Sequence, residues 1–316
     1  MKNVTENQTM NYGFCLLGFQ IFCSLKIPFF LLILILYIII IIGNGTISAL
    51  ILSCHSLSHP MFFFLSHLSF CDITLTTTIV PTMLDGILRG VVQISVSACL
   101  AQFQILCAAV ASECFLLAAI SFDRYLAICN PLRYVYIMRK ELCFQLVILC
   151  WALGCSITFN LTVLISKLEF CGPNIIDHFF CDFLPILQLS CSDTSAVKLG
   201  QLFVATTIAV FSVISIIVTY IYILSTIFRI QSASGRQKAL STCSSHMAVL
   251  GTFLGSLIGL YLLPSHGKTL NANKVLSLLY TVVTPLFNPI IYSLRNSEIR
   301  VAVKKSFKKL NCKFIA

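Results

Sequence analysis

Seven long apolar segments dominate this chain and restrict it to one broad class of fold. A helix needs about 20 consecutive apolar residues to cross the hydrocarbon layer of a bilayer, and each segment is at least that long. Only 10% of the residues are charged and 58% are hydrophobic, against roughly 25% charged residues in soluble domains. We therefore predict an all-α membrane protein, a seven-transmembrane helix bundle. The segments cover residues 27–52, 60–83, 98–129, 142–165, 199–230, 239–263 and 275–294.

The basic residues predict the orientation of the bundle. The net charge of +10 is concentrated in short connections and in the C-terminal tail, as in cytoplasmic loops. Seven spans put the chain ends on opposite sides, so the N-terminus, with sequons at Asn3 and Asn7, is expected outside the plasma membrane. No removable signal peptide is predicted, and no phosphate-binding or aromatic-basic pattern points to nucleic acid. The basic residues include Arg133, Arg139, Lys140, Arg229, Arg236, Lys238, Arg295, Arg300, Lys304, Lys305, Lys308, Lys309 and Lys313.

Three regions are expected along the chain. They are an extracellular segment at 1–25, the transmembrane domain at 26–295 and a cytoplasmic tail at 296–316. In the tail, Ile299, Val303 and Phe307 recur every four residues among lysines and one arginine. This spacing predicts an amphipathic helix that lies on the inner leaflet, where the basic side chains contact anionic membrane lipid.

Four cysteines are expected on the outer side of the membrane. Cys99 begins the third span, and Cys171, Cys181 and Cys191 lie in the long connection at 166–198. Thiols in an oxidising compartment form lasting disulfides. Four cysteines allow three pairings, and the spacing does not choose among them.

Polar side chains inside predicted spans are costly to bury and are therefore candidates for function. Two of them, Asp72 and Glu113, are carboxylates, which repel one another unless a cation, a shared proton or water separates them. A sodium ion or a proton between them is one expectation, and the other is two protonated acids on unrelated faces. Pro285 and Pro289 predict a bend in the last span, because each removes a backbone hydrogen bond. The polar side chains are Asn44, Asp72, Glu113 and Asn288.

An acid–arginine pair, Asp123-Arg124, ends the third span shortly before Pro131. A single charge at the centre of a bilayer costs about 3 kcal/mol, whereas a neutralised pair at the water boundary costs less. Two interpretations of Arg124 remain open on these residues. It is either an ordinary cytoplasmic anchor or a functional switch.

Taken together, these motifs resemble a known family. Seven spans with Gly43-Asn44, Asp72, Cys99, Trp151 and the Asp123-Arg124-Tyr125 triplet are similar to rhodopsin-like G-protein-coupled receptors. Further runs resemble the signatures of olfactory receptors, and the long connection is similar to the tetrapod-type, class II branch. These runs are Pro-Met-Phe-Phe-Phe-Leu-Ser at 60–66, Ala-Ile-Cys-Asn-Pro-Leu-Arg-Tyr at 127–134, Lys-Ala-Leu-Ser-Thr-Cys-Ser-Ser-His at 238–246 and the stretch 285–296.

The resemblance implies a receptor and not an enzyme. A small, mostly apolar odorant is expected among the third, fifth, sixth and seventh spans, with a stimulatory, olfactory-type heterotrimeric G protein as partner and cyclic AMP as product of signalling. The implied disulfides are Cys99–Cys181 and Cys171–Cys191. The implied ligand-binding residues are Leu106, Cys107, Val110, Ala111, Leu257, Ile258, Tyr261, Leu278 and Thr281. The implied activation switch comprises Asp123, Arg124, Tyr125, Tyr220, Asn288, Pro289 and Tyr292.

The chain also departs from the family pattern. Phe62 and Phe122 stand where tyrosines are usual, and Leu254 replaces a tyrosine linked to ligand sensing. The two alternative functions are a proton-coupled membrane transporter and a non-olfactory rhodopsin-like receptor for an amine or a peptide. A proton-coupled transporter would use Asp72 and Glu113, but the internal repeats typical of carriers are missing. A receptor for an amine would carry an acid where Leu106 stands.

Overall fold

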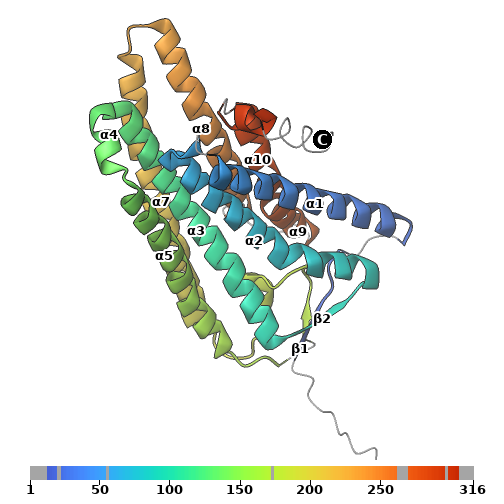
Figure 1. Ribbon diagram of the computed structural model, residues 1–316. Helices are drawn as coiled ribbons and strands as arrows, with labels where there is room; N and C mark the ends of the chain where they lie inside the picture. Colours follow the sequence, from blue (N-terminus) through green and yellow to red (C-terminus); the bar gives the residue numbers. More distant parts are fainter. Residues whose placement is uncertain are drawn as a thin grey trace, which may run out of the picture.

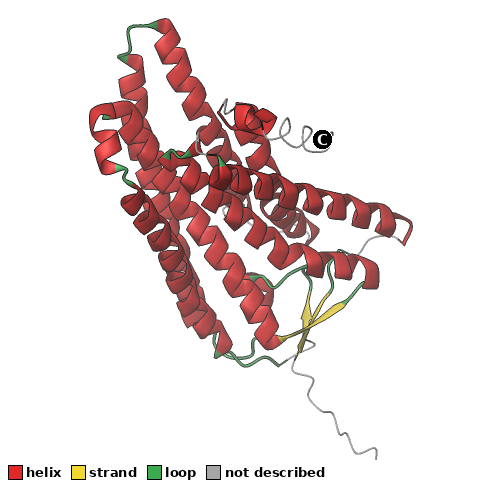
Figure 2. Cartoon of the chain, in the orientation of Figure 1, coloured by secondary structure: helices red, strands yellow, loops and turns green. Residues whose placement is uncertain are grey.

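The structure is a computed structural model that describes residues 13–19, 23–54, 57–171, 174–261, 270–295 and 298–305. It is a bundle of long helices with a small sheet at one end (Figures 1 and 2). The sequons at Asn3 and Asn7 lie outside the described residues. The long helices are α1 (Cys23–Ser53), α2 (Pro60–Arg89), α3 (Val96–Cys129), α5 (Lys140–Ser166), α7 (Ser195–Phe228) and α8 (Ala233–Tyr261). The seventh is built from α9 (Leu270–Leu278), the wider η2 turn (Leu279–Val283) and α10 (Thr284–Arg295).

The prediction of an all-α membrane protein is confirmed. Six described helices are long and apolar enough to span a bilayer, and α8 takes the place of the predicted sixth span. On α7, large side chains such as Ile214 and Ile221 are 55% and 60% exposed. Such a surface suits lipid, because helices that satisfy their own backbone can present apolar side chains to hydrocarbon.

Every predicted span became a helix, although several bounds were wrong. α2 continues to Arg89, six residues beyond the predicted end at Met83, and α8 begins at Ala233 and not at 239. Backbone hydrogen bonds continue a helix past the lipid boundary, so the end of an apolar run need not end the helix. Two short helices were missed, α4 (Pro131–Ile137) and α6 (Phe183–Gln188).

The third span, α3, is the centre of the bundle and contacts α2, α5 and α7. Its buried residues include five alanines, which let neighbouring helices approach closely. At the crossing with α5, a Cβ added to Gly154 would collide with the Ser112 hydroxyl. The glycine is therefore what permits the spacing between α3 and α5.

A three-stranded sheet closes one end of the bundle, which we call the sheet end. Its order is β2 (Val92–Ser95), β1 (Gly13–Leu16), β3 (Ile175–Ile176), with β1 antiparallel to β2 and parallel to β3. It joins the N-terminal segment to the connection before α3 and to the long loop. Sequence analysis missed this sheet, since strands of two to four residues are too short for a clear alternating pattern.

The opposite end of the bundle carries Arg124, and we call it the Arg124 end. A further helix at 298–305 packs there. Ile299 and Ala302 are buried in the same apolar cluster as residues of α2 and α3, with Val303 packed against it, while Lys304 and Lys305 are exposed. The predicted amphipathic helix is present over these residues, and Ile299 and Ala302 on its apolar face pack on the bundle. Phe307 lies outside the described residues.

Candidate functional site

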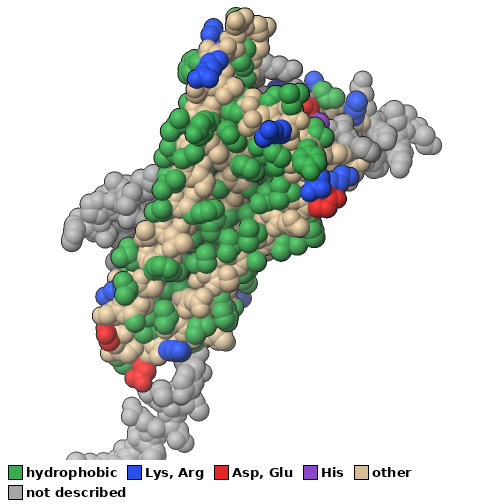
Figure 3. Space-filling model, turned by 90° about the vertical axis from the view of Figure 1, so that its left-hand side faces the viewer, with side chains coloured by type: hydrophobic (Ala, Val, Ile, Leu, Met, Phe, Trp, Pro, Cys, Tyr) green, Lys and Arg blue, Asp and Glu red, His purple; other side chains and the backbone are tan. Residues whose placement is uncertain are grey.

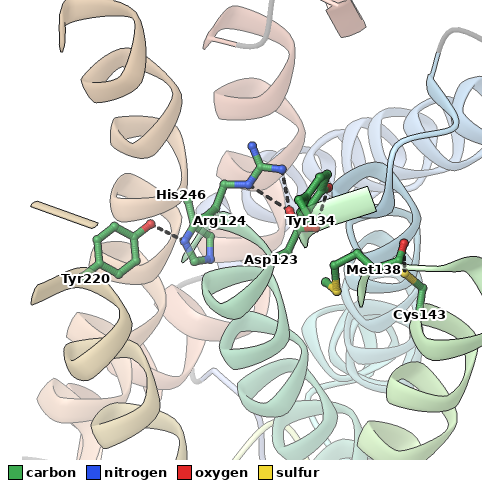
Figure 4. Close-up of polar contacts among 7 residues, drawn as sticks. All are labelled: Asp123, Arg124, Tyr134, Met138, Cys143, Tyr220 and His246. Carbon is green, nitrogen blue, oxygen red and sulfur yellow. Dashed lines mark hydrogen bonds and ion pairs between the residues drawn. The ribbon is translucent and has the colours of Figure 1, made fainter. Parts of the chain in front are cut away.

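The Asp123–Arg124 pair is the centre of the polar contacts at the Arg124 end (Figure 4). Asp123 is fully buried, and Arg124 donates to its Oδ2 from Nη2 at 2.5 Å and from Nε at 3.0 Å. The hydroxyl of Tyr134, on α4, donates to Oδ1 at 2.9 Å. Burial and the negative Asp123 raise the pKa of Tyr134, so its hydroxyl keeps the proton that it donates. Both carboxylate oxygens therefore have partners.

A second polar contact lies across the bundle from this pair. The hydroxyl of Tyr220 on α7 and Nδ1 of His246 on α8 are 2.6 Å apart, and their rings stack at 5.8 Å. Figure 4 shows the Arg124 side chain between this contact and the Asp123–Tyr134 contact. Tyr220 was predicted as part of a switch, whereas His246 and Tyr134 had been noted only as members of longer motifs.

Two other predicted switch residues are Tyr125 and Tyr292. Tyr125 is half-buried on α3, and its hydroxyl accepts a hydrogen bond from the Asn130 amide at 3.4 Å. Tyr292 lies in α10, and its side chain is outside the described part of the structure. The residues that meet around Arg124 thus come from α3, α4, α7 and α8, four elements that are separate in sequence.

A buried polar cluster occupies the middle of the bundle. The Asn288 amide donates to both oxygens of Asp72, at 3.1 and 2.9 Å, which joins the seventh helix to α2. The Asn44 amide donates to the backbone oxygens of Ile40 and Pro285, both at 3.1 Å. Three of the four predicted polar residues are thus connected through α1, α2 and α10.

Close packing beside this cluster depends on Gly43 and on Pro289, one of the two prolines at which a bend is predicted. A Cβ added to Gly43 would lie 3.2 Å from the ring of Pro289. The η2 turn lies just before Pro285, whose missing N–H removes one rung of the helix. This widened turn is where the seventh helix departs from α geometry.

Glu113 is the fourth polar residue, and it has the least satisfied side chain. It is 1% exposed, interacts electrostatically with Asp72 and leaves Oε1 without a hydrogen-bond partner among the described residues. The described residues contain no group of three or more His, Cys, Asp or Glu that could hold a metal ion. Hard cations, however, also accept amide and hydroxyl oxygens. Six side-chain oxygens are buried and unpartnered in the described part of the chain: Asn44 Oδ1, Ser69 Oγ, Glu113 Oε1, Ser212 Oγ, Ser277 Oγ and Asn288 Oδ1.

The predicted ligand-binding residues do not all face one apolar region. Leu106, Val110 and Leu278 pack in a cluster with Phe179 and Phe180 of the long loop. The sequence analysis did not name these two loop aromatics as candidates, although they lie in the long connection that resembles the class II branch.

The remaining predicted ligand residues are placed differently. Cys107 packs in another cluster, around the Cys99–Cys181 bond. Thr281 is buried, and its hydroxyl donates to the Ser277 backbone oxygen at 2.7 Å, so its proton is already used. Ala111 is buried on α3. Leu257, Ile258 and Tyr261 belong to α8, and their side chains lie outside the described part of the structure.

The sheet end is held by two disulfides, Cys99–Cys181 and Cys171–Cys191, with Cα–Cα distances of 5.5 and 5.8 Å. These are the two pairs that the family resemblance implies. The Gln102 side chain adds a further link, because its Oε1 accepts from the Cys181 backbone N–H at 2.9 Å. The loop is therefore fastened to α3 by one covalent bond and one hydrogen bond.

A buried lysine was missed by sequence analysis. Lys274 on α9 is 2% exposed, forms an ion pair with Asp177 of the loop and donates to the Gly18 backbone oxygen at 2.8 Å. It thus ties the seventh helix to the loop and to the N-terminal segment. Next to it, His178 is buried with both ring nitrogens unpartnered among the described residues. Burial and the positive Lys274 lower the pKa of His178 to about 3, despite the opposing effect of Asp177.

Comparisons with known proteins agree on one family and one fold. The olfactory receptor family model matches residues 33–310. The chain is 44% identical to olfactory receptor 5P55 of Mus musculus over 97% of its length and 99% of the relative. It is 42% identical to olfactory receptor 11L1 of Homo sapiens, over 96% and 94%. The crystal structure of squid rhodopsin matches the fold with a TM-score of 0.73 at 18% identity, over 92% of this chain and 82% of that one.

Proposed function

Because the chain belongs to the olfactory receptor family, we propose that it binds a small, mostly apolar volatile ligand and activates a stimulatory, olfactory-type heterotrimeric G protein. The response is a rise in cyclic AMP. The observation that carries this proposal is the buried Asp123–Arg124 pair at one end of the bundle. The other end is closed by the three-stranded sheet and the disulfide-linked loop at 166–198, which together we call the cap. A transporter is set aside because the family is one of receptors.

The proposed orientation puts the sheet end outside the cell. Disulfides persist in oxidising compartments, and both bonds lie at that end. The Arg124 end then faces the cytoplasm, where the positive-inside rule expects basic residues such as Arg139, Lys140 and Arg229. This arrangement leaves Arg124 accessible to a G protein once the helices separate.

The proposed ligand site is apolar and lies beneath the cap. Leu106, Val110 and Leu278 share a cluster with Phe179 and Phe180, which favours a ligand that binds by shape and burial. Such a ligand needs no ionic anchor, and the nearby buried cation Lys274 already has a carboxylate partner. This environment favours a neutral odorant over an amine or an acid.

The proposed switch is the release of Arg124. In the arrangement described, Asp123 neutralises the guanidinium and the Tyr220–His246 contact joins α7 to α8. A ligand shifts such an equilibrium only by binding one state more tightly than the other. Outward movement of α8 breaks the Tyr220–His246 contact and exposes Arg124 to the G protein.

The polar cluster is proposed to bind a sodium ion or a proton. The unpartnered oxygens of Asn44, Glu113 and Asn288 suit a hard cation near Asp72, and either species would separate the two carboxylates. Such an ion would favour the closed arrangement by joining α1, α2, α3 and the seventh helix.

The function is tested by screening volatile ligands on cells that carry a cyclic-AMP reporter. Neutral apolar volatiles should give dose-dependent responses. Val110→Trp should abolish or shift them at unchanged surface level, because one large side chain removes much of a site of a few hundred Å³. Ile38→Trp is the matched control, since Ile38 is a 46% exposed residue of α1 away from the site. Responses to amines alone, or full responses in the Val110 variant, would contradict the proposed ligand site.

A further inference from the structure

A lateral groove lies on the flank of the bundle, away from the proposed odorant site. It has a volume of about 610 Å³ and is formed between α3, α5 and α7 in the half of the bundle nearer Arg124. Figure 3 shows the side of the bundle that includes α5 and α7. The middle of this surface is mostly apolar, and basic side chains lie toward the two ends of the bundle. Its lining includes Phe122 and Tyr125 of α3, Leu149 of α5, and Phe211, Ser215 and Tyr222 of α7.

The position of the groove decides what surrounds it. α3, α5 and α7 are all membrane-spanning, and lining residues such as Leu149, Phe211 and Tyr222 are 51%, 57% and 57% exposed on the outside of the bundle. The groove therefore opens sideways toward hydrocarbon and not toward water. An odorant that enters from the sheet end would reach the Leu106 and Val110 cluster first.

The two aliphatic hydroxyls of the lining, on Ser215 and Thr219, offer little to a polar ligand. Ser215 donates to the Phe211 backbone oxygen at 2.6 Å, and Thr219 donates to that of Ser215 at 2.9 Å. Both hydroxyl protons are thus used within α7. A saturated or unsaturated hydrocarbon chain fits this surface better than any hydrogen-bonding molecule.

The length of the groove and the charges beyond it point to one kind of lipid. From Phe211 to Tyr222 the α7 wall extends about 16 Å, which is close to one leaflet of hydrocarbon, roughly 15 Å. Exposed basic residues follow at the Arg124 end: Arg229 caps α7, and Arg139 and Lys140 begin α5. Along each helix they lie about 10 Å beyond the last lining residue.

We propose that this groove is a binding site for an anionic phospholipid of the leaflet at the Arg124 end. One acyl chain lies between α3, α5 and α7, and the head-group phosphate lies near Arg139, Lys140 and Arg229. The attraction adds to chain burial, because each basic side chain near an anionic surface strengthens the association.

Such a lipid would act on the proposed switch. Phe122 and Tyr125, which immediately precede and follow the Asp123–Arg124 pair in the sequence, both line the groove. On α7, the lining residue Tyr222 is two residues after Tyr220. A chain that fits the groove favours the spacing of α3 and α7 in which it fits. The lipid is therefore a candidate modulator of the closed arrangement, on a surface that the odorant does not use.

The test uses the full-length receptor in nanodiscs and requires neither an odorant nor a G protein. Phosphatidylserine, phosphatidylcholine and a sterol, each with a photoactivatable group in the apolar part, are crosslinked in turn and the labelled peptides are mapped. We expect phosphatidylserine to label residues 146–153 and 211–222 preferentially. Uniform labelling of all helices, equal labelling by phosphatidylcholine, or preferential labelling by the sterol would each overturn the proposal.

Variants separate the chain site from the charge site. Leu149→Trp and Ser215→Trp place bulk in the groove from α5 and from α7 and should remove the preferential labelling, whereas Ile38→Trp on α1 should not. Neutralising one basic residue, as in Lys140→Gln, should lower the preference for phosphatidylserine about fivefold, the effect expected for one cation near an anionic surface. A thermal melt in the same nanodiscs verifies folding, and preferential labelling that survives in either folded tryptophan variant rules out the groove.

Discussion

Arg124 contacts a carboxylate whose two oxygens are both engaged. Its Nη2 and Nε reach Asp123 Oδ2, and the Tyr134 hydroxyl occupies Oδ1. An ordinary membrane anchor needs only a positive charge at the water boundary. The geometry instead uses the planar, forked shape of the guanidinium, which lysine lacks. A substitution that keeps the charge and changes the shape therefore distinguishes the two roles.

We predict that Arg124→Lys loses ligand-stimulated cyclic AMP at matched surface level. Lysine lacks the planar fork with which the released Arg124 would bond several acceptors of the G protein. One charge-assisted hydrogen bond contributes about 1.5–3 kcal/mol, so its loss should lower the population of the active complex tenfold or more. The measurement is a dose–response curve in reporter cells with surface labelling. Arg133→Lys, at an exposed arginine of α4, is the control. A curve equal to that of the parent would leave Arg124 as an anchor.

Between elements, the packing of α3 against α5 depends on a single glycine. Ser112 donates to the Cys150 backbone oxygen at 3.4 Å beside Gly154, so the two helices have little room to separate. Small residues at such crossings let van der Waals contacts act between helices that have no hydrophobic drive to associate in lipid.

We predict that Gly154→Ala destabilises the receptor by about 1–3 kcal/mol, the usual cost of overpacking a tight core. The added methyl group would collide with the Ser112 hydroxyl. Thermal unfolding in detergent measures the loss. Gly45→Ala is the control, because no described atom lies within 4 Å of a Cβ at that helical glycine. Equal melting temperatures for the two variants would show that α5 moves aside without cost.

The loop and α3 form another pair of elements, joined through Cys99 and Cys181. We predict that peptide mapping under non-reducing conditions finds Cys99 linked to Cys181 and Cys171 linked to Cys191. Loss of the first bond in Cys181→Ser should cost about 2–5 kcal/mol of stability, because the link closes a long loop in the unfolded chain. Cys155→Ser, at an exposed unpaired cysteine of α5, should have little effect. A Cys99–Cys171 peptide would refute the pairing.

For the molecule as a whole, the cap and the bundle are held by contacts that involve buried charge. Lys274 joins the seventh helix to Asp177 and to the N-terminal segment. His178 is buried beside this ion pair, and its ring stacks on Phe179 at 4.7 Å. Since the pKa of His178 falls to about 3, the folded receptor keeps this ring neutral over the range in which an exposed histidine becomes protonated.

We predict that acidification below pH 6.5 destabilises the receptor through His178. Above that pH the ring is neutral in both states, and no difference arises. Between pH 6.5 and 3 only the unfolded state binds the proton, so stability falls by about 1.4 kcal/mol per unit, or about 2 kcal/mol at pH 5. Melting curves at pH 7.5 and 5 measure this loss.

His178→Phe is the matched variant, because it keeps an aromatic ring on Phe179 and removes the titrating group. It should lose less stability than the parent on acidification. Parallel losses in the two proteins would show that other groups cause the pH dependence.

The sequence alone determined the seven helices and which polar side chains lie inside them. Apolar runs of 20 residues or more can be satisfied only as spanning helices, and a buried Asp72, Glu113 or Asn288 must find partners inside the bundle. Both statements follow from the cost of unpaired polar groups in lipid. They need no knowledge of how the helices are arranged.

The tertiary structure alone decided which distant residues became partners. Lys274 pairs with Asp177, and Tyr220 with His246, across sequence separations of 97 and 26 residues. No periodic pattern encodes such pairs, because each depends on the rotation of two helices or on the path of a loop. The small sheet and the inward packing of Ile299 were missed for the same reason. Short strands and single apolar faces acquire a partner only when the whole chain is folded.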